Sequence, residues 1–248
     1  MPTRVLLDTD IGSDIDDALC LAYLLQQPAC DLLGVTTVSG DVDDRARLAD
    51  LLCTAAGRKV EIFPGATNPL RGPTKQPSVA QASVLPKYPH RKDFPHGEAI
   101  EFLRRSIRKY PGEVTLLAIG PLTNVALLFM VDPEIPRLLK SLVLMGGNYV
   151  PIRWGSTGGG LTEWNIWNDP WAADIVFSAA LSAVFALGQD VTTKVVMKPE
   201  PVRARFDSGL LRVVRDMAEV WFSQGRDEIT FHDPLAAVSI FEPDVCVF

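Results

Sequence analysis

The sequence predicts an α/β protein with a mostly parallel central sheet flanked by helices, that is, a Rossmann-like open sheet. Short apolar runs alternate along the chain with segments in which leucines recur at helical spacing. This order of strands and helices is typical of a parallel sheet covered by helices. Acidic or glycine-rich segments follow several of the apolar runs. Because open parallel sheets bind ligands beyond the carboxyl ends of their strands, these segments are the candidate site.

Length and composition favour one domain that spans residues 1–248. With 248 residues, of which 47% are hydrophobic and 22% charged, the chain can bury a substantial core. The net charge of −6 argues against nucleic acid as a partner, since phosphate binding requires a basic surface. A small neutral substrate is compatible with this charge.

The cysteines and the apolar runs favour a cytoplasmic protein without a membrane span. Cys20, Cys30, Cys53 and Cys246 form no C-x-x-C pair, so we expect free thiols. No apolar run approaches the roughly 18 residues of a membrane helix. The chain enters its first apolar run at Val5, so we expect no signal peptide.

The first half of the chain predicts three strands, at residues 5–7, 32–38 and 60–63. One helix is predicted at residues 18–27, and a second runs through Leu48 and ends near Gly57. Residues 64–95 contain seven prolines, so we expect a long loop without regular structure, part of which forms an active-site flap.

The second half predicts strands at residues 113–119, 142–148 and 183–187, and helices at 99–110, 125–130, 171–180, 210–221 and from His232 onward. Residues 149–161 are glycine-rich, contain Trp154 and predict a second mobile loop near the pocket. Residues 163–170 alternate polar and aromatic side chains, which suits a pocket wall that binds sugar hydroxyls.

Five aspartates lie within the ten positions that follow the first strand: Asp8, Asp10, Asp14, Asp16 and Asp17. Carboxylates crowded in this way repel one another unless a cation neutralises them. Helix capping would explain one or two of the five. A divalent metal explains the whole cluster, and all-oxygen ligands suit Ca²⁺ or Mg²⁺ better than zinc.

Two other acidic motifs compete for this segment. An EF-hand loop that starts at Asp8 would need glycine at its sixth position, but Gly12 is the fifth residue, so the register fails. A phosphatase of the haloacid dehalogenase type would use Asp8 as nucleophile and Asp10 as general acid/base with Mg²⁺. That match ends at Asp10, and the phosphatase remains an alternative.

The segment Asp-Thr-Asp-Ile-Gly-Ser-Asp-Ile-Asp-Asp-Ala at residues 8–18 resembles the N-terminal signature of the inosine-uridine preferring nucleoside hydrolases. Members of this family cleave the N-glycosidic bond of ribonucleosides with a bound Ca²⁺. Similar motifs follow in the family's order at residues 120–124, 145–147, 163–165 and 232–234. The resemblance covers nearly the whole chain and implies a nucleoside hydrolase-like fold and an N-ribohydrolase of nucleoside salvage.

The resemblance also implies roles for individual residues. The Ca²⁺ ligands would be Asp10, Asp17, Asp233 and the backbone carbonyl of Ile119. Asp10 would take the proton of a Ca²⁺-bound water that attacks the sugar, and His232, with an ordinary pKa of about 6.5, would protonate the departing base. The implied ribose contacts are Asp16, Asp41, Met145, Glu163 and Asn165.

Some positions depart from the family pattern. Asp41 stands where the family usually has Asn, and Asp14 has no counterpart in the signature. The chain ends at Phe248, whereas members usually continue through further helices, so a shortened member that binds Ca²⁺ and ribose without turnover is a second alternative. The resemblance implies a homodimer or homotetramer, and the choice between purine and pyrimidine nucleosides stays open.

Overall fold

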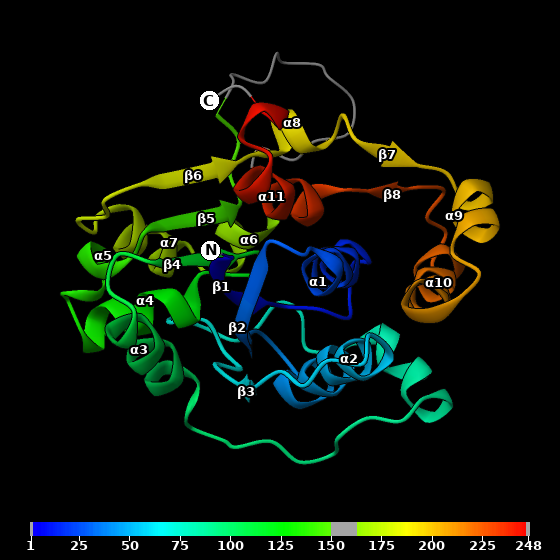
Figure 1. Ribbon diagram of the computed structural model, residues 1–248, viewed down its shortest axis with the longest axis horizontal. Helices are drawn as coiled ribbons and strands as arrows, with labels where there is room; N and C mark the ends of the chain where they lie inside the picture. The colour runs from blue at the N-terminus through cyan, green and yellow to red at the C-terminus, as the bar shows by residue number, and fades with distance from the viewer. Residues whose placement is uncertain (1, 150–162, 247–248) are drawn as a thin grey trace.

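A six-stranded parallel sheet forms the centre of the computed structural model, which describes residues 2–149 and 163–246. Its strand order is β3-β2-β1-β4-β5-β6 (Figure 1). The strands are β1 (Thr3–Thr9), β2 (Cys30–Thr37), β3 (Ile62–Pro64), β4 (Val114–Ala118), β5 (Ser141–Met145) and β6 (Val184–Leu187). Each of them overlaps a predicted strand. The α/β class with a parallel sheet is therefore confirmed.

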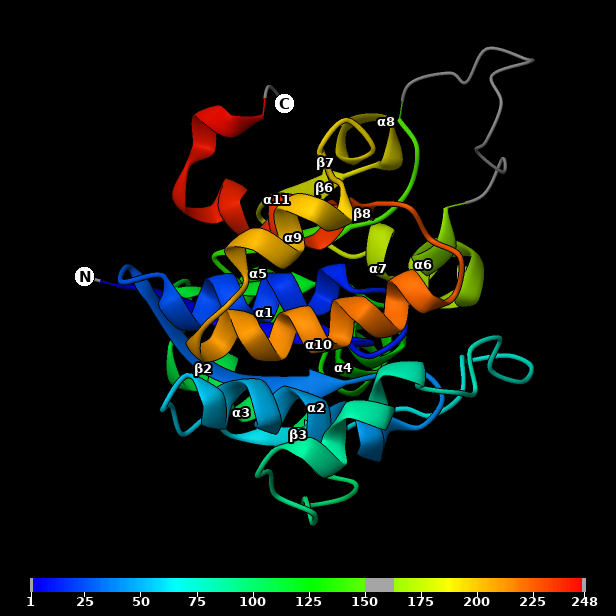
Figure 2. The same cartoon turned by 90° about the vertical axis from the view of Figure 1, so that its right-hand side faces the viewer.

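Helices cover both faces of this sheet. One face carries α1 (Asp16–Gln26), α2 (Val42–Ala55) and α11 (His232–Phe241), and α10 (Gly209–Ser223) packs against α1 and α2 (Figures 1 and 2). The other face carries α3 (Ala99–Lys109), α4 (Thr123–Val131), α5 (Ile135–Leu138) and α7 (Pro170–Phe177). The molecule therefore has three layers with an apolar core on each side of the sheet.

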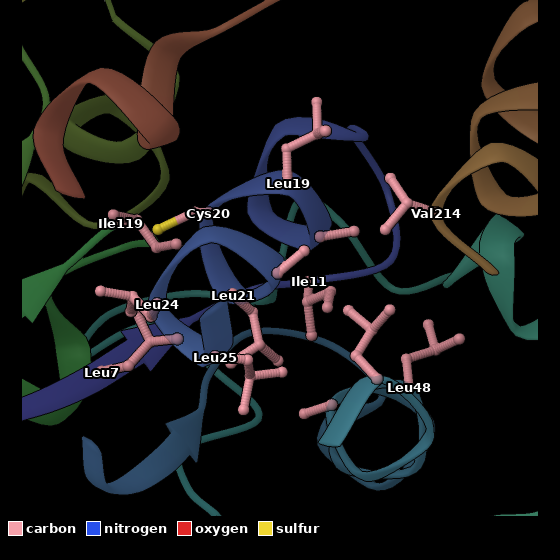
Figure 3. Close-up of a cluster of buried hydrophobic side chains, with 14 of the residues drawn as sticks. Leu7, Ile11, Leu19, Cys20, Leu21, Leu24, Leu25, Leu48, Ile119 and Val214 are labelled. Atoms are coloured by element: carbon pink, nitrogen blue, oxygen red, sulfur yellow. The ribbon is translucent and has the colours of Figure 1, made fainter. Parts of the chain in front are cut away.

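The central strand β1 shows how the sequence divides between the two cores. Val5 and Leu7 belong to the core that α1, α2 and α11 share, whereas Leu6 belongs to the core beneath α3 and α4. Successive side chains of a strand point to opposite faces, so an uninterrupted apolar run is what a strand buried on both sides requires. Figure 3 shows Leu7 of β1 beside Leu24 of α1.

Several short elements were not expected from the sequence. They are α5, α6 (Trp164–Asn168), α8 (Gln189–Thr192), α9 (Pro199–Arg205), the 3₁₀ helix η2 (Pro243–Val245), and an antiparallel pair of two-residue strands, β7 (Val196–Met197) and β8 (Ile229–Thr230). These elements lie mainly between β6 and α11. The chain returns through them to bring α11 back against α1.

The proline-rich segment is a correction to the sequence prediction. Residues 64–95 were expected to lack regular structure, but η1 (Ala80–Lys87) is a 3₁₀ helix with Pro86 near its end. It packs against α2 and α10. The predicted loop at residues 149–161, including Trp154, lies almost wholly outside the described residues.

Two other expectations concern side chains and membranes. Cys20, Cys30 and Cys53 are buried free thiols, as expected. Within residues 2–149 and 163–246, no helix is both long and apolar enough to cross a membrane.

Candidate functional site

The candidate site lies where the sheet changes its winding direction, between β1 and β4. From these adjacent strands the chain continues into α1 on one face and α4 on the other, which leaves a crevice beyond their carboxyl ends. A cavity of about 930 Å³ occupies this position. It is lined by the acidic segment after β1, by Ile119 and Met145 at the ends of β4 and β5, and by residues of α6, α8 and the α10–α11 connection.

An acidic cluster forms one wall of the cavity. Asp16 and Asp17 begin α1, Asp233 lies in the first turn of α11, and their carboxylates offer oxygen atoms within 4.8 Å of one another. All three side chains are buried, and burial together with the neighbouring negative charges raises each pKa well above its ordinary value. Buried carboxylates at this spacing, with oxygen as the sole ligand atom, fit a divalent cation.

Asp10 and the turn after β4 adjoin this cluster. Burial raises the pKa of Asp10 to about 6, against the opposing effect of the nearby Arg45 charge. Gly120 lies so close that a Cβ atom there would stand 2.9 Å from Asp10 Oδ1. The turn that follows Ile119 therefore lies directly against the Asp10 carboxylate. Asp10 and Ile119 both line the cavity.

Two residues that hold the acidic segment were missed from the sequence. Arg45 of α2 is fully buried and donates hydrogen bonds to the backbone carbonyls of Ser39, Asp10 and Ile11. Thr9 Oγ1 donates to Asp17 Oδ1 at 2.5 Å. A signal for Arg45 was present, because positions 45, 48 and 52 share one helical face and Leu48 and Leu52 are buried.

The ribose residues predicted after β5 meet at the start of α6. Glu163 accepts hydrogen bonds from the backbone N–H groups of Asn165 (2.8 Å), Ile166 (3.0 Å) and Gly147 (3.1 Å). Asn165 Nδ2 donates to the carbonyls of Ile119 (2.9 Å) and Met145 (3.1 Å). These bonds tie α6 to the ends of β4 and β5, and Glu163, Asn165 and Met145 all line the cavity.

His232 faces the same cavity from the first residue of α11. Its Nδ1 lies 2.6 Å from Thr192 Oγ1 of α8. Burial lowers the pKa of His232 to about 4. The ordinary pKa assumed from the sequence is therefore wrong for this environment, and the ring is neutral at pH 7.

The structure places two predicted aspartates elsewhere. Asp41 is exposed, caps α2 by accepting from the backbone N–H of Asp44 at 3.0 Å, and is not among the described residues that line the cavity. Its predicted ribose contact stays a prediction. Asp8 is fully buried in β1, where it accepts from Asn124 Nδ2 at 2.7 Å. This position does not provide the accessible nucleophile that the phosphatase alternative requires.

Further polar residues complete the lining. They are Ser13, Asp14, Gln76, Asn148, Gln189, Asp190, Thr193, Gln224, Arg226, Glu228 and Thr230, with Trp164 and Trp221. Gln76 comes from the proline-rich segment and accepts from Trp164 Nε1 at 3.1 Å. Most of these positions lie in loops or short elements whose folding the hydrophobic pattern does not specify.

Comparison with known proteins agrees with this geometry. The family model described as inosine-uridine preferring nucleoside hydrolase matches residues 5–247. Uridine nucleosidase 1 of Arabidopsis thaliana is 32% identical over 267 residues, which cover 99% of this chain and 76% of that protein. The non-specific ribonucleoside hydrolase RihC of Escherichia coli is 35% identical over 210 residues, covering 81% and 66% of the two chains.

A solved structure shows the same fold. The plant nucleoside hydrolase PpNRh1 superposes with a TM-score of 0.81 at 26% identity, covering 98% of this chain and 80% of that one. The sheet order, the acidic cavity and these similarities lead to one conclusion. The chain belongs to the inosine-uridine preferring nucleoside hydrolase family and is an enzyme that hydrolyses the N-glycosidic bond of ribonucleosides.

Proposed function

We propose that this nucleoside hydrolase depends on a Ca²⁺ ion held by Asp10, Asp17, Asp233 and the backbone carbonyl of Ile119. The observation that carries the proposal is the acidic cluster of Asp16, Asp17 and Asp233, because buried carboxylates within 4.8 Å of one another repel strongly without a cation. Asp10 adjoins this cluster, and its negative charge contributes to the raised pKa of both Asp17 and Asp233. The ligand atoms are all oxygens, which suits a hard cation. When bound, the ion would supply positive charge that lowers the pKa of a neighbouring water and helps to orient the ribose.

The side chains around the cluster suggest how the reaction proceeds. Asp10 is proposed to take the proton from the water that attacks the sugar carbon, and Asp16 to accept a hydrogen bond from the ribose 2′-hydroxyl. The transition state of N-glycosidic cleavage places positive charge on the sugar. The carboxylates that line the cavity favour this charge electrostatically.

Asn165 and Glu163 are proposed to hold the remaining ribose hydroxyls, with Met145 packed against the sugar. Both N–H groups of the Asn165 amide are engaged by the carbonyls of Ile119 and Met145. Asn165 Oδ1 is therefore the atom that would accept from a hydroxyl. The Glu163 carboxylate, held by three backbone N–H groups, would likewise act as an acceptor.

His232 is proposed to donate a hydrogen bond to the departing base. Because burial lowers its pKa to about 4, the ring is neutral at pH 7 and carries one proton. If Nδ1 accepts from the Thr192 hydroxyl, that proton lies on Nε2, which is then free to donate. Thr192 would thereby select the productive tautomer.

A homo-oligomer is also proposed, as the resemblance implies. Three large apolar side chains around α6 and the start of α7 support it: Trp164, Trp167 and Trp171 are 44%, 42% and 50% exposed. Light scattering after size exclusion measures the oligomeric state. A monomer at micromolar concentration would contradict this part of the proposal.

Ribose release tests the metal-dependent function. The purified protein is incubated with uridine, cytidine, inosine and adenosine, first with a chelator and then after Ca²⁺ is restored. Ribose release should vanish in the chelator and return with Ca²⁺. Full activity in protein shown by elemental analysis to be metal-free would contradict the proposal, as would nucleoside binding without turnover in the presence of Ca²⁺.

A further inference from the structure

Within residues 2–149 and 163–246, the lining of the active-site cavity is strongly acidic and contains one positively charged side chain. Eight carboxylate side chains line it: Asp10, Asp14, Asp16, Asp17, Glu163, Asp190, Glu228 and Asp233. Among the described residues of the lining, Arg226 is the only arginine or lysine. An isolated cation in such a site would attract whichever part of a substrate carries or develops negative charge.

Arg226 lies on the connection between α10 and β8, the same stretch of chain that leads to His232. Figure 2 shows the path of this connection from α10 to β8. Its guanidinium carbon is 4.6 Å from the centre of the Trp221 ring. The indole is itself fixed, because Trp221 Nε1 donates to the backbone carbonyl of Glu228 at 3.0 Å. Arg226 is also close enough to Asp14 to attract its carboxylate. An aromatic support and an acidic neighbour thus restrict where the guanidinium can lie.

Negative charge develops on one part of the substrate only. As the bond between C1′ and the base nitrogen breaks, its electron pair moves to the base, while the water oxygen bonds to C1′ and its proton passes to the Asp10 carboxylate as proposed above. In uracil and hypoxanthine the negative charge spreads onto carbonyl oxygens. The five lining carboxylates outside the proposed Ca²⁺ ligand set, Asp14, Asp16, Glu163, Asp190 and Glu228, oppose that charge, and a guanidinium would offset their effect.

We propose that Arg226 binds the departing base through its carbonyl oxygen and so favours oxo bases over amino bases. Arginine has five N–H donors and no acceptor. It can bind O4 of uracil or O6 of hypoxanthine, whereas N4 of cytosine and N6 of adenine are amines that would face it donor to donor. Arg226 can act in this way only if the cavity binds nucleosides as proposed above.

The test compares substrate pairs that differ at this one group. kcat/KM is measured for uridine against cytidine and for inosine against adenosine, in the wild type, Arg226→Gln and Arg226→Lys. Arg226→Gln should lower kcat/KM for the oxo substrates roughly 10- to 100-fold, the range of a charged hydrogen bond, and for the amino substrates less than about threefold. Arg226→Lys should recover part of the loss. Arg212→Gln is the matched control, because Arg212 is exposed on α10 and bonds the carbonyl of Asp207.

Leaving-group strength provides a second readout. 5-Fluorouracil forms a more stable anion than uracil, so 5-fluorouridine should lose less activity than uridine in Arg226→Gln. Free uracil binding, measured by calorimetry, requires no turnover and should weaken in the variant. Equal losses for all four nucleosides, or unchanged uracil affinity, would overturn the assignment. Ribose release by the wild type with and without chelator tests the proposed metal-dependent function separately, whereas the ratio of kcat/KM between paired substrates in Ca²⁺ tests the role of Arg226.

Discussion

Asp233 joins the acidic cluster from the far end of the chain. We expect Asp233→Asn to lower Ca²⁺ affinity and ribose release by more than about 100-fold, since even groups that merely support metal ligands contribute 10- to 100-fold. In chelator the same variant should unfold at a higher temperature than the wild type, because one of the mutually repelling buried charges is gone. Calorimetry with Ca²⁺ and thermal unfolding measure the two effects.

The control for this experiment is Asp227→Asn. Asp227 is 89% exposed and pairs with Lys198 outside the cavity. The Asp227→Asn substitution removes one negative charge, as Asp233→Asn does, but leaves the acidic cluster unchanged. If Asp233→Asn bound Ca²⁺ as tightly as Asp227→Asn, Asp233 would not be a ligand.

Gly120 is a second residue at which a small change should have a large effect. A methyl group there would meet Asp10 Oδ1 at 2.9 Å and Val38 Cγ1 at the same distance. We expect Gly120→Ala to displace the Asp10 carboxylate and lower kcat at least about tenfold, since small displacements of reacting groups are costly. Steady-state kinetics measure this. An unchanged kcat would mean that Asp10 can move without consequence for the chemistry.

The sequence predicted the acidic residues of the site better than it predicted Arg45 and Thr9, which hold the acidic segment in place. The spacing of Asp10, Asp16 and Asp17, and the pair His232-Asp233, marked side chains that the structure brings to one cavity. Asp41 appeared equivalent in sequence but caps a helix, because an aspartate before a helix can satisfy a backbone N–H as readily as a ligand. Sequence alone does not decide between these uses.

At the level of elements, α11 determines where Asp233 lies. This helix packs against α1, and the backbone N–H of Asp233 faces Asp16 Oδ2 at 3.4 Å. Ala236 and Ala237 are fully buried in α11, so the helix has no room for larger side chains there. The packing of two helices therefore fixes the spacing of the carboxylates.

The packing of α11 on α1 can be tested by a substitution that changes none of the proposed Ca²⁺ ligands. Ala236→Leu should destabilise the fold by about 1–3 kcal/mol through overpacking and should also weaken Ca²⁺ binding, because α11 shifts relative to α1. Ser239→Ala, which removes a local bond to the carbonyl of Ala236 from a half-buried position, should leave Ca²⁺ affinity nearly unchanged. Chemical denaturation and calorimetry measure both. Loss of stability with unaltered Ca²⁺ affinity would show that the cluster does not depend on helix position.

Elements with strong apolar patterns were predictable, and those held by tertiary contacts were not. The apolar run at residues 5–7 predicts β1, and the leucines at positions 21, 24 and 25 predict α1. η1 contains little of this pattern. Its Gln81 side chain donates to the carbonyl of Asp14 at 2.9 Å, and such a contact between distant segments has no local signature. The same holds for the two-residue strands β7 and β8.

For the molecule as a whole, the buried acids predict an unusual dependence of stability on pH. Burial raises the pKa of Asp8 to about 7 and that of Asp10 to about 6, from an ordinary 3.8. The folded state therefore takes up protons between pH 7 and about 5, whereas the unfolded chain does so near pH 4. In chelator, the free energy of unfolding should rise as the pH falls from 8 to about 5.

Calcium should weaken this trend, since the ion and protons compete for the carboxylates of Asp10, Asp17 and Asp233. Asp8 lies outside the proposed ligand set, so its contribution remains. Thermal unfolding at several pH values, with chelator and with excess Ca²⁺, gives the comparison. Each kcal/mol of added stability should raise Tm by about 2–4 °C in a chain of this size. A Tm in chelator that falls steadily from pH 8 to 5 would contradict the raised pKa values.

The acidic cluster combines residues from the two ends of the chain, and this affects when the metal can bind during synthesis and folding. Asp16 and Asp233 are 217 positions apart. During synthesis the first aspartates leave the ribosome long before their partner exists, so a growing chain carries unneutralised acids at the edge of its central strand. Under the proposed ligand set, the ion can be captured only after α11 has emerged and docked, and metal uptake then becomes a late event that reports correct folding of everything before it.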